Sequence, residues 1–126
     1  MNKKQLRVPD RIQHMLEAVD NINLDIGNLT EEQFLADGKT QRAVIESIIV
    51  IGEAANRIMG LDPTIEQNHQ EIWQQLRDAY EMRIVLTHEY FRVDPTIVWT
   101  TVKNHIPQLA HLLSRFCSDN YQSGCQ

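Results

Sequence analysis

Three side chains with complementary chemistry lie within the segment from Arg83 to Tyr90, which is otherwise largely apolar. Arg83 carries a permanent charge and a planar fork of donors that suits the oxygens of a phosphate. His88 supplies an imidazole, which exchanges protons readily near neutral pH, and Tyr90 supplies a hydroxyl that can donate, accept or be modified. RNA cleavage without a metal requires a cation for the phosphorane and groups that move protons at the 2′-OH and the leaving 5′ oxygen.

The geometry of a helix separates these three groups. Each residue of an α-helix turns by about 100°, so Tyr90 lies on the same face as Arg83, whereas His88 projects about 140° away from it. One regular helix therefore cannot direct all three side chains at one point. Either the helix loosens near Thr87, or a second copy of the chain completes the site. A symmetric dimer would gather two copies of Arg83 and of His88 around one cleft.

Purely structural roles are the alternative for each of these residues. Arg83 can lie along a helix surface, His88 at a half-buried helix end, and Tyr90 in the core. Trp73 and Trp99 could stack on bases, yet both sit on apolar stripes, where packing in the core is favoured.

Two charged residues elsewhere are candidates to support a cleft. Glu53 and Arg57 stand four residues apart in the order that favours a simple ion pair on a helix surface. Their functional alternative is to line the cleft and position Arg83 or His88, and Thr87 is a further candidate for the same support. The remaining histidines are scattered without the spacing of metal ligands, so we expect neither a metal nor a cofactor.

Four long helices and one short helix should position these residues. Apolar residues recur at helical spacing over 10–26, 40–59, 70–86 and 95–116. Thr30 begins a capping box, and the short helix that follows should end near Asp37, where Gly38 stops it. We predict an all-α fold, an up-and-down bundle of four main helices plus a short extra helix, which dimerises through its helices. Residues 1–116 should form a single helical domain and 117–126 a flexible C-terminal tail.

Two of these helices have unusual features. In 40–59 the apolar residues cover most of the circumference, which predicts a central helix or one that a second subunit buries. Its run Ile48 to Ile51 also fits a buried strand, although Ala54 and Ala55 favour a helix. Pro107 interrupts the last pattern and should kink or divide that helix, because proline removes a backbone hydrogen bond.

Composition limits the classes of function. The chain has 126 residues and a net charge of −5, which argues against a protein that coats nucleic acid through bulk electrostatics. Any contact with RNA must therefore come from a local cluster of cations. The N-terminus lacks the apolar run of a signal peptide, and the longest apolar block is too short to span a bilayer. We expect a cytoplasmic protein with no membrane partner.

The spacing of the central residues matches the motif R-x-x-x-x-H-x-Y, followed by Phe91 and then by Asp94 and Pro95. On this motif the chain resembles the HepT-like toxins of the HEPN superfamily. The agreement extends to the stretch Ile51-Gly52-Glu53-Ala54-Ala55 and to Trp99 and Pro107, and it spans most of the chain. Ile84 departs from the pattern, since many members carry a polar residue directly after the motif arginine.

This resemblance implies a function and a partner. It implies a HEPN-like homodimer that acts as a metal-independent endoribonuclease toxin on mRNA or tRNA, with Arg83 and His88 as the catalytic pair. It also implies a toxin–antitoxin pair like those of type VII, in which a minimal nucleotidyltransferase antitoxin adenylylates Tyr90. Adenylylation would place bulk and negative charge beside Arg83, where a substrate phosphate must bind.

Two other functions remain open at this point. One is a non-catalytic helical subunit that binds and orients a partner nucleotidyltransferase. The other is a structural helical dimer with no role in nucleic-acid chemistry. The expected mark of the structural dimer is the absence of a concave basic cleft around the motif.

Overall fold

The computed structural model describes residues 7–89 and 92–121, and this part of the chain is helical with no β-strand. The elements in chain order are α1 (Val8–Ile26), α2 (Glu31–Leu35), α3 (Gly38–Leu61), α4 (Ile65–Asn68), α5 (Gln70–His88), α6 (Pro95–Thr100), the π-helical segment η2 (Thr101–His105) and α7 (Ile106–Tyr121). The prediction of an all-α fold is confirmed, as are the four long helical segments and the short helix near Thr30. The single turn of α4 was not predicted.

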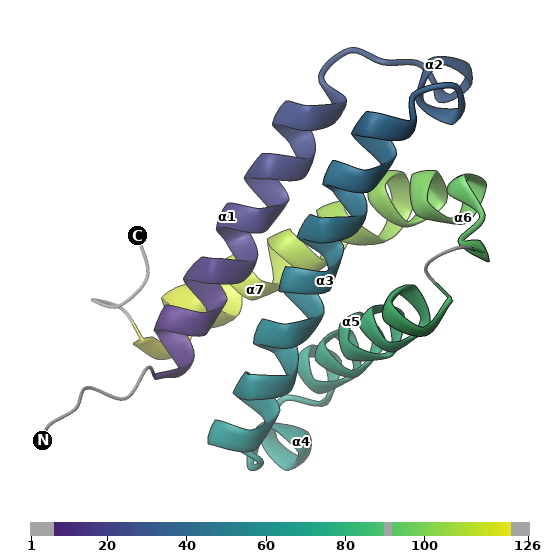
Figure 1. The fold of residues 1–126 in the computed structure, drawn as a ribbon. Helices are drawn as coiled ribbons and strands as arrows, with labels where there is room; N and C mark the ends of the chain where they lie inside the picture. The colour runs from purple at the N-terminus through teal and green to yellow at the C-terminus, as the bar shows by residue number, and fades with distance from the viewer. Residues whose placement is uncertain (1–6, 90–91, 122–126) are drawn as a thin grey trace, which may run out of the picture.

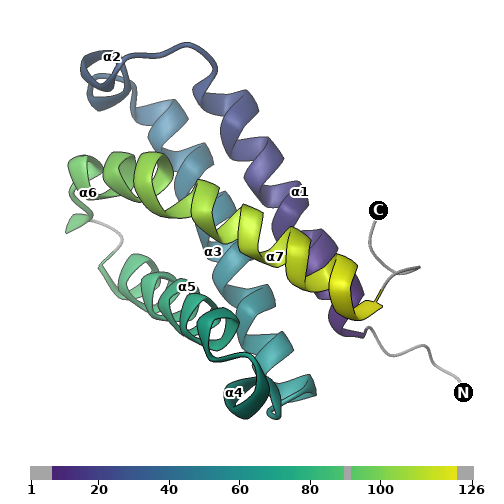
Figure 2. The same ribbon diagram turned by 180° about the vertical axis from the view of Figure 1, so that it is seen from behind.

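The four long segments run alternately up and down (Figure 1). Helix α3 lies between α1 and α5 and packs along both of them. The C-terminal run of α6, η2 and α7 crosses the far side of this layer and contacts α1 and α5, as the reverse view shows (Figure 2). The opposite side of the layer is therefore left uncovered by any helix of the described chain.

Helix α3 is the centre of the hydrophobic core. Its residues Ile48 and Ile51 are 2% and 1% exposed, and Ala54 and Ala55 are also buried. The wide apolar surface predicted for this segment is explained within one chain, because α1 covers one side and α5 the other. Burial of each large aliphatic side chain contributes about 1.5–3 kcal/mol. The alternative of a buried strand at Ile48 to Ile51 is wrong.

Side-chain caps define where the helices begin. The capping box at Thr30 is present, with Thr30 and Gln33 each accepting the other's backbone N–H at 3.2 and 2.9 Å. Asp94 accepts the N–H of Thr96 at 2.9 Å, and α6 begins at Pro95 as predicted.

The junction between α2 and α3 differs from the expectation. Helix α2 ends at Leu35, and Asp37 is the N-cap of α3 rather than the end of the short helix. Its carboxylate accepts the backbone N–H of Thr40 at 3.0 Å and the hydroxyl of Thr40 at 2.8 Å. These two hydrogen bonds lower the pKa of Asp37 below its ordinary value of 3.8. Gly38 therefore starts α3 instead of stopping α2.

Pro107 divides the last helical run, as predicted. Proline has no N–H for the carbonyl of Lys103, and its ring crowds that carbonyl. The chain accommodates this by widening into the π-helical segment just before it, where the N–H of Ile106 bonds to the carbonyl of Thr101, five residues earlier. Beyond this segment the run continues as α7, which stays packed against the bundle (Figure 2).

The last helix also extends further toward the C-terminus than predicted. Helix α7 continues to Tyr121, and Cys117 is 1% exposed within the core, so 117–121 does not belong to a tail. Residues 122–126 lie outside the described residues. No helix in the described chain is both long and apolar enough to cross a membrane.

Candidate active site at the crossing of α3 and α5

Arg83 lies where α5 comes closest to α3. The contact is possible because α3 has a glycine at this point: a Cβ atom on Gly52 would collide with the Cβ of Arg83 and would come within 2.7 Å of the backbone oxygen of Ala79. The side chain of Arg83 is 31% exposed, so its aliphatic part packs between the helices while its guanidinium reaches the surface. Gly52 thus determines how closely Arg83 approaches α3.

The guanidinium of Arg83 forms an ion pair with α3. Its Nε atom lies 3.1 Å from Oε1 of Glu53, although the N–H does not point along that line, so the contact is ionic rather than a hydrogen bond. The other carboxylate oxygen of Glu53 accepts a hydrogen bond from Nε of Arg57, also at 3.1 Å. One carboxylate therefore bridges two guanidinium groups, and the remaining N–H groups of Arg83 have no protein partner among the described residues.

His88 is the last residue of α5 and is exposed to solvent. Its Nδ1 atom lies 3.0 Å from the carbonyl oxygen of Ile84. A carbonyl can only accept, so Nδ1 must be the protonated nitrogen and Nε2 of the neutral ring carries a free lone pair. The ring is thereby held in the tautomer that a general base needs, with Nε2 directed away from its own helix.

Helix α5 stays regular through this region. The hydroxyl of Thr87 is shared between the carbonyl oxygens of Arg83 and Ile84, at 3.0 and 3.1 Å, and the N–H of Glu89 bonds to Val85 as in an α-helix. The expected loosening near Thr87 is therefore not observed.

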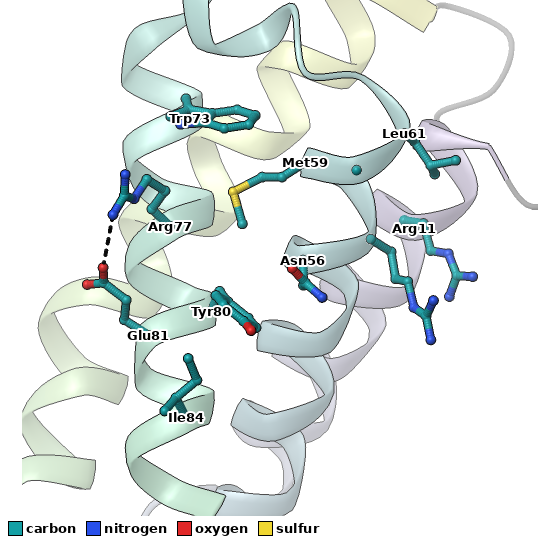
Figure 3. A pocket seen from close by; sticks show the side chains of 11 residues that line it. Arg11, Asn56, Met59, Leu61, Trp73, Arg77, Tyr80, Glu81 and Ile84 are labelled. Atoms are coloured by element: carbon teal, nitrogen blue, oxygen red, sulfur yellow. Dashed lines mark hydrogen bonds and ion pairs between the residues drawn. The ribbon is translucent and has the colours of Figure 1, made fainter.

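A groove runs beside this crossing on the uncovered side of the bundle. It encloses about 800 Å³ between the C-terminal part of α3, the stretch of α5 from Trp73 to Ile84 and the start of α1. We call it the α3–α5 groove, and the residues of interest in its lining are Arg11, Asn56, Arg57, Trp73, Arg77 and Tyr80. Figure 3 shows Tyr80 and Trp73 directed from α5 toward α3, with Arg77 and Arg11 on opposite sides.

A smaller hollow of about 390 Å³ adjoins this groove and contains the ion-paired cluster. Glu53 and Arg83 line it together with Arg11 and His14 of α1. Arg11 lines both spaces, and Ile84, the neighbour of Arg83, lines the larger one. A concave surface that carries several arginines therefore lies beside Arg83 and Ile84, contrary to the mark expected of a purely structural dimer, although His88 lines neither space.

Comparison with known proteins identifies the family. The family model described as "Ribonuclease HepT-like" matches residues 15–116, which include both Arg83 and His88. The chain belongs to the HepT-like ribonuclease family. A Thermococcus cleftensis protein named "Probable ribonuclease HepT" is 39% identical over 101 residues, covering 79% of this chain and 86% of that protein. A Methanocaldococcus jannaschii protein with the name "Putative RNase" is 34% identical over 109 residues, covering 85% and 83%. No solved structure matches the chain.

Membership in the HepT-like family makes this protein a ribonuclease and gives the crossing of α3 and α5 its chemical context. The fold brings Glu53, Arg57 and Arg83 together. No hydrogen bond or ion pair between described residues joins His88 to this cluster, and Tyr90 lies outside the described residues together with Phe91. Within a single HepT-like chain, the cation and the imidazole therefore stay on separate sides of α5.

Several residues of this HepT-like site were not found by sequence reasoning. Arg11 comes from α1, and nothing in its spacing relates it to a motif more than seventy residues away. Asn56 and Arg77 were not among the candidate residues either. Gly52 had a signal, since a glycine inside an otherwise apolar helix often marks a close approach of another backbone.

Proposed function

We propose that this HepT-like ribonuclease is a metal-independent endoribonuclease that acts as the toxin of a toxin–antitoxin pair and cleaves mRNA or tRNA. The proposal rests on the contacts of the two motif residues Arg83 and His88. Arg83 is held by Glu53 with N–H groups to spare, and His88 is held as the tautomer whose Nε2 can accept a proton. These are the cation and the base that phosphodiester cleavage requires.

The proposed reaction is an internal transfer within the RNA. Nε2 of His88 takes the proton of the 2′-OH, and the 2′ oxygen attacks the adjacent phosphorus. Arg83 stabilises the negative charge that gathers on the phosphorane oxygens. The bond from phosphorus to the 5′ oxygen breaks, and that oxygen leaves with a proton from a protonated imidazole. The products are a 2′,3′-cyclic phosphate and a 5′-hydroxyl.

We further propose that the active form is a homodimer. The reaction needs one imidazole as base and another as acid, but each chain supplies one His88. The regular course of α5 also keeps His88 about 140° around the helix from Arg83. Two copies related by a twofold axis would supply two of each residue to one cleft. Val85, which lies between them in sequence and is 52% exposed, gives this region an apolar surface that a second copy would bury.

The proposed control acts through Tyr90. A minimal nucleotidyltransferase antitoxin would transfer AMP to its hydroxyl, two residues beyond His88 in sequence. The added phosphate would compete for the cation that must bind the substrate, because it carries negative charge into the neighbourhood of Arg83. Support for this step comes from the family resemblance and from the charge of the Glu53, Arg57 and Arg83 cluster.

The central test is cleavage of purified mRNA and tRNA in the presence of EDTA. We expect the wild-type protein to cleave, and His88→Ala and Arg83→Ala to lose about a hundredfold or more of the rate. His111→Ala, which changes an exposed histidine of α7, is the matched control and should cleave normally. Equal cleavage by wild type and His88→Ala would contradict the proposal. Unchanged cellular toxicity of both motif variants, with partner binding intact, would instead indicate a non-catalytic subunit.

The antitoxin step has a separate test. The protein is coexpressed with the nucleotidyltransferase encoded beside it, and its intact mass is measured. We expect an increase by whole AMP units that is absent from Tyr90→Phe, whereas Tyr80→Phe should still be modified. An unmodified wild-type mass, or modification that persists in Tyr90→Phe, would contradict the proposal.

A further inference from the structure

The α3–α5 groove has the chemistry of a nucleotide-binding site, although none of the catalytic steps uses it. We propose that it binds a nucleotide of the RNA substrate that flanks the cleaved phosphodiester, with arginines on the backbone phosphates and an aromatic wall beside the base. This inference rests on the proposed function, because it assigns a subsite to the same active centre. It concerns recognition of the substrate rather than the cleavage step.

Unsatisfied donors are the first support. Nε of Arg11 and Nε1 of Trp73 are both buried from solvent, and neither has a hydrogen-bond partner in the described chain. Both residues line the groove. A buried N–H group without a partner costs about 1–3 kcal/mol, so each of these side chains would gain by turning its N–H toward an acceptor in the groove. Phosphate, ribose and base oxygens are acceptors of the required kind.

The lining of the groove is the second support, because it combines cations for phosphates, an aromatic ring for a base and an amide for a base edge. Arg11, Arg57 and Arg77 are cations around a groove whose only acidic lining residue, among those that the structure describes, is Glu81, which is already paired with Arg77 at 3.4 Å. Tyr80 is directed into the groove from α5 (Figure 3). Aromatic rings of this kind stack on bases of any sequence. Asn56, on the facing side of α3, presents an amide that can both donate to and accept from a base edge.

Continuity with Arg83 is the third support. Arg11 lines both the groove and the small hollow that holds Glu53 and Arg83. An RNA strand whose scissile phosphate lies at Arg83 would therefore continue past Arg11 into the groove. The overall charge of −5 excludes attraction by the whole surface, so a local cluster of arginines must provide the electrostatic part of binding. The volume of about 800 Å³ is large enough for a nucleotide.

The test uses a short single-stranded RNA with 2′-O-methyl groups, which cannot be cleaved because the nucleophile is blocked. Binding is measured by fluorescence anisotropy over a range of salt concentrations. We expect the double variant Arg11→Gln, Arg77→Gln to bind at least tenfold more weakly at low salt. Its slope of log affinity against log salt should fall by about 1.4, because each lost phosphate contact of a single strand removes about 0.7. Arg115→Gln removes one positive charge from an exposed position on α7 and should change neither value.

A second readout locates the bound strand. The chain has two tryptophans, so the variant Trp99→Phe leaves Trp73 as the sole one. Trp99 packs against Phe34 away from the groove, so its replacement should leave the groove intact. We expect the 2′-O-methyl RNA to quench the Trp73 fluorescence with the same midpoint as the anisotropy titration. An absence of quenching at saturating RNA would place the strand elsewhere and overturn the inference.

The outcomes separate this inference from the proposed function. Weak binding by the arginine double variant together with normal wild-type cleavage supports both. Unchanged binding by that variant overturns the groove subsite, whatever the cleavage assay shows. Normal binding of the uncleavable RNA by a protein that never cleaves would overturn the nuclease alone. If the double variant converts a dimer to a monomer in analytical ultracentrifugation, the groove is an interface between copies and the subsite is overturned.

Discussion

At the scale of single residues, the decisive feature is a carboxylate that bridges two guanidinium groups. Glu53 contacts Arg57 along its own helix and Arg83 across to α5, at 3.1 Å in both cases. An arginine that is already held by an ion pair loses less side-chain freedom when it binds a phosphate. The entropic cost of placing its guanidinium beside the scissile phosphate is therefore lower. We therefore propose that Glu53 positions Arg83.

Replacing Glu53 by Gln tests this role. We expect kcat for RNA cleavage to fall by about tenfold, because Arg83 loses its fixed orientation. KM should stay the same or decrease, since the loss of a negative charge leaves the site more attractive to phosphate. Steady-state kinetics on one RNA substrate gives both values. Glu46→Gln removes the same charge from an exposed position on the same helix and should behave as wild type. A rise in KM with unchanged kcat would contradict the assignment.

Sequence reasoning captured part of this cluster. The spacing of four residues between Glu53 and Arg57 predicts their ion pair, and the motif points to Arg83. Whether Glu53 pairs on the surface or supports the site was left open, and the structure shows that it reaches both partners at once. The contact to Arg83 depends on how two helices cross, as does the approach of Arg11, and no local spacing in the sequence encodes that crossing.

At the scale of the elements, the crossing of α3 and α5 depends on Gly52. Substitution by Ala should destabilise the protein by about 1–3 kcal/mol, because the added methyl collides with the Cβ of Arg83 and with the backbone of Ala79. The displacement of Arg83 should also reduce cleavage by about a hundredfold. Chemical denaturation and a cleavage assay measure the two effects.

Gly60 provides the control for this substitution on the same helix. A Cβ atom on Gly60 would meet nothing within 4 Å. Gly60→Ala should therefore raise stability by up to about 1 kcal/mol through the better helix propensity of alanine. Because Gly60 lines the α3–α5 groove, only the stability of this variant is compared with that of Gly52→Ala. Equal effects of the two substitutions would show that the close approach at Gly52 is unimportant.

The cap of α3 makes the stability of the protein depend on pH. Hydrogen bonds from Thr40 lower the pKa of Asp37, so its ionised form stabilises the fold above the ordinary value of 3.8, and this contribution is lost as pH falls through the lowered folded value. Asp37→Asn keeps a capping side chain but cannot ionise. We expect it to be less stable than wild type at pH 7 and equally stable in strong acid, as followed by urea denaturation at several pH values. A constant difference across that range would contradict the role of the charge.

The elements themselves were largely predictable, and their ends were not. Four helices follow from the apolar periodicity, and Pro107 marks the disturbance of the last one correctly. The start of α3 was misplaced because Gly38 reads as a helix stop, whereas Asp37 caps a helix that begins at that glycine. The end of α7 was placed too early because the polar residues after Cys117 face solvent on a helix whose other side remains buried.

At the scale of the whole molecule, the proposed dimer predicts complementation between defective chains. Arg83→Ala and His88→Ala are each expected to be nearly inactive alone. Mixed dimers formed by coexpression or by unfolding and refolding together contain one intact Arg83 and one intact His88, which a shared cleft can bring into one site. We expect the mixture to recover part of the cleavage that neither variant has alone, because the single His88 of a mixed dimer can serve only one of the two proton transfers. No recovery, with mixed dimers verified by mass spectrometry, would contradict a cleft built from two chains.

The bridge between Arg57, Glu53 and Arg83 also sets the net charge that a bound phosphate group meets. Two cations and one anion leave a surplus of a single positive charge in the empty cluster. A phosphodiester within an RNA strand carries one negative charge, so the occupied cluster is electrically neutral. A terminal phosphate carries nearly two and would leave an excess of negative charge in a partly desolvated place. We therefore expect the cluster to bind the interior of a strand in preference to its phosphorylated end.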